Sequence, residues 1–136
     1  MPNTVTGGCA CGAVRYEYSA DPVFMGNCHC RDCQRTTGGA YVAGIGVPES
    51  ALKITGIVKY HELAGDSGKR VSRGFCPSCG SRLFSAIEAR PEIVAILAGS
   101  LDDPSIYKPT VDIYTSSAQP WDHMDPQTVK FLKMPE

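Results

Sequence analysis

The sequence has no long apolar run and no excess of charge of either sign. Because no apolar segment reaches the roughly 20 residues that a membrane-spanning helix needs, we expect no membrane span. The formal net charge is −1 over 136 residues. Proteins that bind nucleic acid or an anionic membrane surface through charge need a strongly basic face. We therefore expect neither nucleic acid nor a membrane as a partner.

Several common signatures are also missing. The sequence contains no Ser/His/Asp triad signature, phosphate-binding loop or dinucleotide fingerprint. It has no internal repeat, linker or low-complexity segment, so residues 1–136 are expected to form a single domain with a core of about residues 5–121. The opening MPNTVTGG lacks both the charged and the apolar parts of a signal peptide, which favours a cytoplasmic location.

Seven cysteines are the most informative residues of the chain. An odd number cannot pair completely into disulfides, and a reducing cytoplasm does not favour disulfides, so metal ligation is the better use of closely spaced thiols. Iron–sulfur clusters also use four thiolates, but zinc is the more common occupant of such paired motifs. The cysteines fall into three groups: Cys9 and Cys11; Cys28, Cys30 and Cys33; and Cys76 and Cys79.

The first and third groups together offer four thiolates. Glycines flank Cys9 and Cys11, and Gly80 follows Cys79, so the backbone can turn tightly around an ion. A closed shell of four thiolates is typical of a structural zinc site, which contributes directly to folding. The alternative is that these are buried free cysteines that act as small apolar side chains.

The middle group is one thiolate short of a closed shell. A zinc ion held by Cys28, Cys30 and Cys33 would have an open position, as catalytic zinc sites do. Its formal charge would be −1, which makes it a poor generator of hydroxide but a good binder of an external thiolate. The alternative is a second structural zinc whose fourth ligand is a histidine or water. The candidates for that ligand are His29, His61 and His123.

Two arginines next to the middle group suit a substrate with carboxylates. Arg31 and Arg35 can pair with carboxylates through parallel hydrogen bonds, which favours a thiol such as glutathione as a partner. The more distant Lys69, Arg70, Arg73 and Arg82 are interpreted as ordinary solvated charges. His29 is flanked by two candidate ligands, so on an extended segment its ring should point away from the metal.

The dominant hydrophobic period is two, which predicts strands. Alternation is clear around 14–19, 41–47 and 58–61, while 93–97 is apolar on both faces and should be a central strand. Residues 111–114 are expected to form the last strand, and 64–68 a hairpin loop. Short helical turns are expected at 31–36, 104–107 and 126–132. This pattern predicts one mainly antiparallel β domain.

These motifs together resemble the glutathione-dependent formaldehyde-activating enzyme family, which includes the centromere protein V domain. The resemblance extends from Gly8 to about Trp121 and covers all seven cysteines. Three motifs carry it: Gly8-Cys9-x-Cys11-Gly12-x-Val14-Arg15-Tyr16, Cys28-His29-Cys30-x-x-Cys33-Gln34-Arg35-x-x-Gly38 and Phe75-Cys76-x-x-Cys79-Gly80-x-x-Leu83-Phe84. It implies a β-tent fold, with small antiparallel sheets around a structural zinc. It also implies that the structural zinc is held by Cys9, Cys11, Cys76 and Cys79. A catalytic zinc would be held by Cys28, Cys30 and Cys33.

The activity that the resemblance implies is a carbon–sulfur lyase reaction written in reverse. Formaldehyde condenses with glutathione to S-hydroxymethylglutathione, so the expected partners are a small-molecule thiol and a small electrophile. Two alternatives stay open: a non-enzymatic zinc-binding interaction module, and a redox-labile zinc site on the same fold. The sequence does not indicate an oligomeric state.

Overall fold

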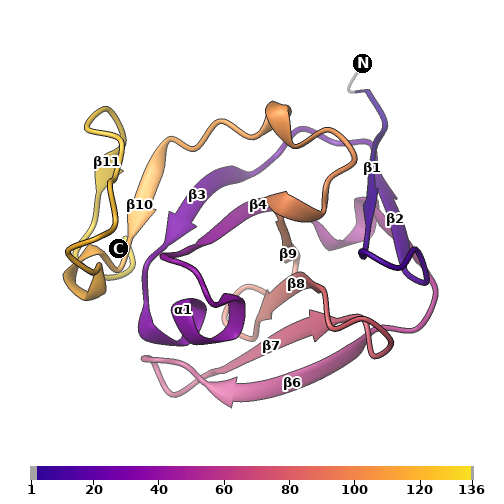
Figure 1. Ribbon diagram of the computed structural model, residues 1–136, viewed down its shortest axis with the longest axis horizontal. Helices are drawn as coiled ribbons and strands as arrows, with labels where there is room; N and C mark the ends of the chain where they lie inside the picture. The colour runs from indigo at the N-terminus through magenta and orange to yellow at the C-terminus, as the bar shows by residue number, and fades with distance from the viewer. Residues whose placement is uncertain (1–2, 136) are drawn as a thin grey trace.

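The structure is a computed structural model and describes residues 3–135. It is mainly β, with one short α-helix and two sheets (Figure 1). The smaller sheet is antiparallel in the order β1-β2-β5. Its strands are β1 (Val5–Gly8), β2 (Arg15–Tyr18) and β5 (Leu52–Thr55).

The larger sheet has eight strands in the order β11-β10-β3-β4-β9-β8-β7-β6. Neighbouring strands are antiparallel except at β10, which runs parallel to both β3 and β11. The strands are β3 (Phe24–Cys28), β4 (Val42–Pro48), β6 (Lys59–Ala64), β7 (Arg70–Phe75), β8 (Arg82–Ile87), β9 (Ile93–Leu97), β10 (Val111–Ile113) and β11 (Val129–Lys130). The predicted central strand at 93–97 is confirmed, because β9 pairs with both β4 and β8.

The alternation in β2 shows how the two sheets share a core. Tyr16 and Tyr18 are buried while Arg15 and Glu17 are exposed, as period two requires. The ring of Tyr16 packs edge-on against Phe84 of β8, with 5.4 Å between the ring centroids. Residues from both sheets therefore pack in one cluster, which includes Val14, Ile45, Val47, Leu83 and Ile96.

The single α-helix of residues 3–135, α1 (Arg31–Thr37), begins where the predicted turn at 31–36 begins. The thiol of Cys30 caps it by accepting a hydrogen bond from the Cys33 N–H at 3.3 Å, and Gly38 ends it with a φ of 77°. Short 3₁₀ turns lie at Glu49–Ala51, Ala98–Ser100, Pro104–Ile106 and Thr115–Ser117. Across residues 3–135, no helix has the length and hydropathy needed to cross a bilayer.

The C-terminal segment differs from the sequence prediction. Residues 126–132 do not form a helical turn, and β11 follows β10, so 111–114 is not the last strand. The reason is tertiary pairing: the N–H groups of Val129 and Phe131 donate to the carbonyls of Thr110 and Asp112 at 3.0 and 2.9 Å. Local sequence pattern carries no information about such pairing across the chain.

Candidate metal centres and the cavity between them

The first and third cysteine groups meet at two hairpin turns. Cys9 and Cys11 lie in the β1–β2 turn, and Cys76 and Cys79 lie in the β7–β8 turn. The sulfurs of Cys9 and Cys11 are 3.6 Å apart, those of Cys11 and Cys76 are 3.8 Å apart, and all four lie within 4.8 Å of one another. Four sulfurs about 2.3 Å from a tetrahedral zinc ion are about 3.8 Å from each other. The four thiols thus fit a closed zinc shell.

The two turns have similar backbones. The Gly12 N–H donates to the Cys9 carbonyl at 3.1 Å, and the Gly80 N–H donates to the Cys76 carbonyl at 2.8 Å. Both glycines have a left-handed φ, 82° and 79°, which other residues rarely adopt. The hydroxyl of Ser81 hydrogen-bonds the thiol of Cys79 and lowers the pKa of that thiol to about 5, which favours the thiolate that a metal needs.

The middle group forms a second cluster around the start of α1. Cys28 ends β3, Cys30 caps α1 and Cys33 lies within α1, and their sulfurs are within 4.8 Å of one another. Val42 and Leu97 pack against the cluster. In the described part of the chain, this group of potential metal ligands has three members and includes no histidine or carboxylate. It is therefore compatible with a metal site that keeps a position open.

The three thiols are electrostatically unequal. Hydrogen bonds with Cys28 and Cys33 hold the pKa of Cys30 well below its ordinary value, whereas the pKa of Cys28 is raised because it shares its hydrogen bond with Cys30. Without a cation, the cluster thus favours one thiolate rather than three. A divalent ion would offset the repulsion between three thiolates, and sulfur ligands suit zinc.

His29 lies between two of these cysteines in sequence but points elsewhere. Its ring is fully buried, with Nδ1 2.5 Å from Asp122 Oδ2 and Nε2 2.6 Å from Asp112 Oδ1. Both ring nitrogens are occupied, so neither is free to bind a metal. The prediction that the His29 ring points away from the metal is confirmed. The sequence did not reveal its partners, because the aspartates are 83 and 93 residues away.

The two predicted carboxylate contacts lie on the exposed side of α1. Arg31 and Arg35 are both exposed, and Arg31 donates a hydrogen bond to the side chain of Gln34. The amide of Gln34 is itself buried and donates to the carbonyls of His29 and Ser117 at 2.7 and 3.0 Å. A contact of Arg31 or Arg35 with a substrate stays a prediction.

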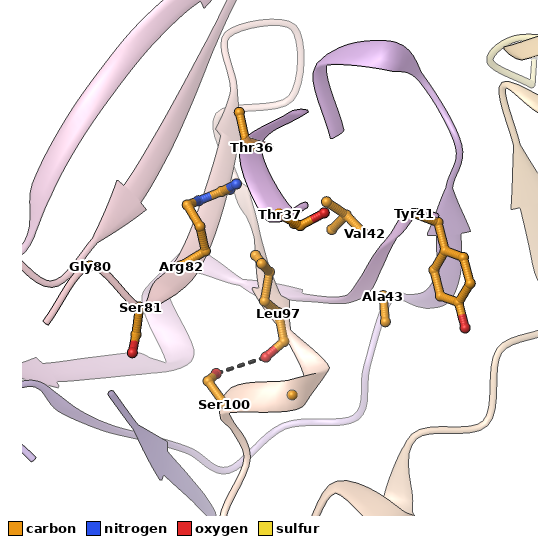
Figure 2. Close-up of a pocket in the computed structure, with 11 residues that line it drawn as sticks. Thr36, Thr37, Tyr41, Val42, Ala43, Gly80, Ser81, Arg82, Leu97 and Ser100 are labelled. Atoms are coloured by element: carbon orange, nitrogen blue, oxygen red, sulfur yellow. Dashed lines mark hydrogen bonds between the residues drawn. The ribbon is translucent and has the colours of Figure 1, made fainter. Parts of the chain in front are cut away.

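A cavity of about 470 Å³ is lined in part by residues that follow each of the two cysteine clusters in the chain. One side comes from Thr36 and Thr37, which follow Cys33 in α1, and the opposite side from Gly80 and Ser81, which follow Cys79 (Figure 2). Val42 and Leu97 belong both to the cavity wall and to the packing around the three cysteines. The full lining is Thr36, Thr37, Tyr41, Val42, Ala43, Gly80, Ser81, Arg82, Leu97, Gly99 and Ser100.

Two arginines near this cavity are not solvated charges, contrary to the sequence interpretation. Arg73 of β7 is 7% exposed, and Arg82 of β8 is half-buried. Arg82 Nη2 donates to the Phe84 carbonyl and the Ser85 hydroxyl at 3.3 and 3.1 Å. The remaining nitrogens Nε and Nη1 of Arg82, and Nη1 of Arg73, are buried without a hydrogen-bond partner among residues 3–135. These positions are unusual, because buried charges are normally paired.

Comparison with known proteins agrees with this arrangement. The family model described as glutathione-dependent formaldehyde-activating enzyme matches residues 4–117, which include all seven cysteines. A crystal structure of a Rhodobacter sphaeroides protein from a structural genomics programme is similar, with a TM-score of 0.59 and 17% sequence identity. The match covers 93% of this chain and 98% of that chain, and shows a shared fold.

Proposed function

The chain belongs to the glutathione-dependent formaldehyde-activating enzyme family, and from this premise we propose that it is a zinc-dependent enzyme of the carbon–sulfur lyase type. It would join a small aldehyde such as formaldehyde to a thiol such as glutathione. The observation that carries the proposal is the three-cysteine cluster, one ligand short of a closed shell, beside a cavity of about 470 Å³.

The two clusters would have different tasks. Cys9, Cys11, Cys76 and Cys79 would hold a structural zinc, because their four sulfurs lie within 4.8 Å of one another and can supply a closed shell. Cys28, Cys30 and Cys33 would hold a second zinc, whose open position, when the ion is bound, favours a substrate thiol in its thiolate form. The cavity would hold the rest of the thiol substrate.

The chain itself contributes position more than acid–base chemistry. The reaction forms one carbon–sulfur bond, and the thiol proton ends on the former carbonyl oxygen, so nothing is oxidised and no group leaves. Val42 and Leu97 form an apolar wall beside the cysteines and limit the access of water. The buried ring of His29, fixed by two carboxylates, holds the backbone between Cys28 and Cys30 in place. Bringing thiol and aldehyde together in the right orientation is then the main source of rate acceleration.

Replacement of one cysteine in each cluster tests this division. We expect Cys30→Ser to keep the fold, to lose one of two zinc ions, and to abolish the acceleration of S-hydroxymethylglutathione formation over buffer, measured by NMR exchange. We expect Cys76→Ser to unfold the domain, because a structural zinc contributes on the order of 10 kcal/mol to folding. Circular dichroism and metal analysis report both outcomes. A Cys30→Ser protein that kept full activity would contradict the proposal.

A further inference from the structure

The lining of the cavity carries a positive charge that has no role in holding either cysteine cluster together. Among its eleven lining residues, Arg82 carries the one charged side chain and no residue is acidic. Five others carry hydroxyl groups: Thr36, Thr37, Tyr41, Ser81 and Ser100. A cavity with one guanidinium group and no acidic side chain suits an anion, since a guanidinium group only donates hydrogen bonds. The hydroxyls of Thr36, Thr37 and Ser100 already donate to backbone carbonyls.

Arg82 also lacks the partner that its burial requires. Its Nε and Nη1 are buried without an acceptor, and none of the ion pairs formed by residues 3–135 includes Arg82 or Arg73. Buried N–H groups without an acceptor are costly, so an anion that accepted hydrogen bonds from this guanidinium would relieve the cost. Arg73, opposite Ser85 on the neighbouring strand, adds a second positive charge to this region, which favours negative charge on the thiols of Cys30 and Cys33.

The position of Arg82 relates the cavity to the cysteines. Figure 2 shows the guanidinium end of Arg82 directed toward Thr36 and Thr37 of α1, the helix that contains Cys33. The hydroxyl groups of both threonines donate to the Cys33 carbonyl, at 3.4 and 2.7 Å. Burial lowers the pKa of Arg82, and the charge of Cys33 acts against that shift, so the guanidinium lies close to the three-cysteine cluster. Arg31 and Arg35, the contacts that the sequence predicts, do not line the cavity.

We propose that Arg82 is the specificity-determining residue of an anion-binding subsite, which receives a carboxylate of the thiol substrate in the cavity beside Cys28, Cys30 and Cys33. The inference rests on the proposed function for the identity of the ligand, a thiol with at least one carboxylate. The subsite itself rests on the cavity lining and on the unpartnered nitrogens of Arg82.

Two thiols that differ in charge test the proposal on cobalt-substituted protein. Mercaptosuccinate carries two carboxylates, and 2-mercaptoethanol carries none. The sulfur-to-cobalt absorption band gives a dissociation constant for each without any turnover. We expect Arg82→Gln to raise the dissociation constant of mercaptosuccinate by about 10- to 100-fold, the usual effect of losing a charged hydrogen bond. The dissociation constant of 2-mercaptoethanol should change by less than about 2-fold. Arg82→Lys should lie between, because it keeps the charge and loses the planar geometry.

Controls separate a binding role from a structural one. Arg70→Gln removes the same charge from an exposed position of the adjacent strand β7 and should change neither constant. The proposal is wrong if Arg82→Gln weakens the binding of both thiols equally or changes neither dissociation constant. It is also wrong if the loss of binding is accompanied by a matching loss in melting temperature. It is also wrong if Arg35→Gln removes the preference for mercaptosuccinate and Arg82→Gln does not.

A thiol-free ligand distinguishes this proposal from the proposed function. If neither thiol alters the cobalt spectrum of the unmutated protein, the thiol-binding role of the cysteine cluster fails. Methylsuccinate, which has the carboxylates without sulfur, then reports on the subsite by calorimetry. Binding that Arg82→Gln weakens by at least about 10-fold supports the subsite, and binding that is absent or independent of Arg82 overturns it.

Discussion

His29 is held by carboxyl groups on both sides of its ring. Nδ1 lies 2.5 Å from Asp122 Oδ2 and Nε2 lies 2.6 Å from Asp112 Oδ1, so both ring nitrogens are hydrogen-bonded. The hydroxyl of Thr128 donates to the same Asp112 carboxylate. This buried group ties the segment between Cys28 and Cys30 to β10 and to the C-terminal residues, and we expect it to be essential for the shape of the three-cysteine cluster.

Replacement of Asp112 by Asn tests that role. An amide at this position loses the carboxylate that hydrogen bonds from Thr128, His29 and Asn27 stabilise, so we expect Asp112→Asn to reduce the free energy of unfolding at pH 7 by about 1–3 kcal/mol. Urea unfolding with excess zinc measures the change. Asp66→Asn is the matched control, because Asp66 pairs with Lys133 on the exposed surface and should change stability by less than about 1 kcal/mol.

The contribution of Asp112 to the free energy of unfolding should depend on pH in a defined direction. Burial opposes its ionisation, but hydrogen bonds from Thr128, His29 and Asn27 hold the pKa of Asp112 below its ordinary value. A lowered carboxyl pKa adds stability that is present in full above the unfolded-state pKa, about 4, and is lost as pH falls through the folded-state pKa. The difference between the two proteins should thus stay constant from about pH 7 to 5 and shrink below about pH 4. A difference that grew on acidification would contradict this view.

The site residues differ in how far their positions can be predicted from the sequence. The cysteine clusters could be predicted because each contributing group lies within one turn, where spacing fixes geometry. Asp112 and Asp122 approach His29 through the fold, and no local pattern marks them. Arg82 did carry a signal that was not used: it lies two residues before the fully buried Phe84, so the period of a strand places both side chains on one face.

At the scale of elements, α1 is short and depends on one polar side chain. A helix of seven residues is not stable by itself, and the buried amide of Gln34 connects it to the carbonyls of His29 and Ser117. These bonds hold the helix that contains Cys33 against the two segments that carry Cys28, Cys30 and the buried aspartates.

Truncation of Gln34 should show this dependence. Gln34→Ala removes these donors from one buried and one partly buried carbonyl, so we expect a loss of about 1–3 kcal/mol in the free energy of unfolding. Arg35→Ala, at the next and exposed position of the same helix, should change the free energy of unfolding by less than about 0.5 kcal/mol. Denaturant unfolding of the two variants gives both values. Equal effects would show that α1 is not anchored through Gln34.

Strands were predictable where their faces differ or where both are apolar. Alternation in 14–19 and the apolar run at 93–97 correspond to β2 and β9. The segment Phe24–Cys28 has neither pattern, yet it forms β3, because β4 and β10 pair with it on both sides. β11 is similar, since its two residues have no propensity that outweighs their pairing with β10.

For the whole molecule, the four-cysteine cluster connects two sheets. It joins the β1–β2 turn of the smaller sheet to the β7–β8 turn of the larger one. The three-cysteine cluster, by contrast, lies between the end of β3 and the first turn of α1 and joins residues that are close in sequence. Loss of an ion should therefore affect the molecule very differently at the two places.

Chelation should proceed in two stages. We expect a strong chelator to remove the ion of the three-cysteine cluster first, without change in far-ultraviolet circular dichroism, because that shell is incomplete. The second ion should leave more slowly and together with the β signal, since its binding free energy is folding free energy. A chromogenic metal indicator and circular dichroism, followed on one sample, give both time courses. Simultaneous loss of both ions would show that the clusters are not independent.

The β7–β8 hairpin carries features of both sites. Cys76 and Cys79 lie in its turn, and Arg82 begins its second strand only three residues after Cys79. An ion at the turn consequently sets where the wall of the cavity lies. Zinc should therefore have to bind at this turn before the protein can discriminate between thiols. A preparation with too little zinc to fill the turn in every molecule would be a mixture of proteins that differ in this discrimination.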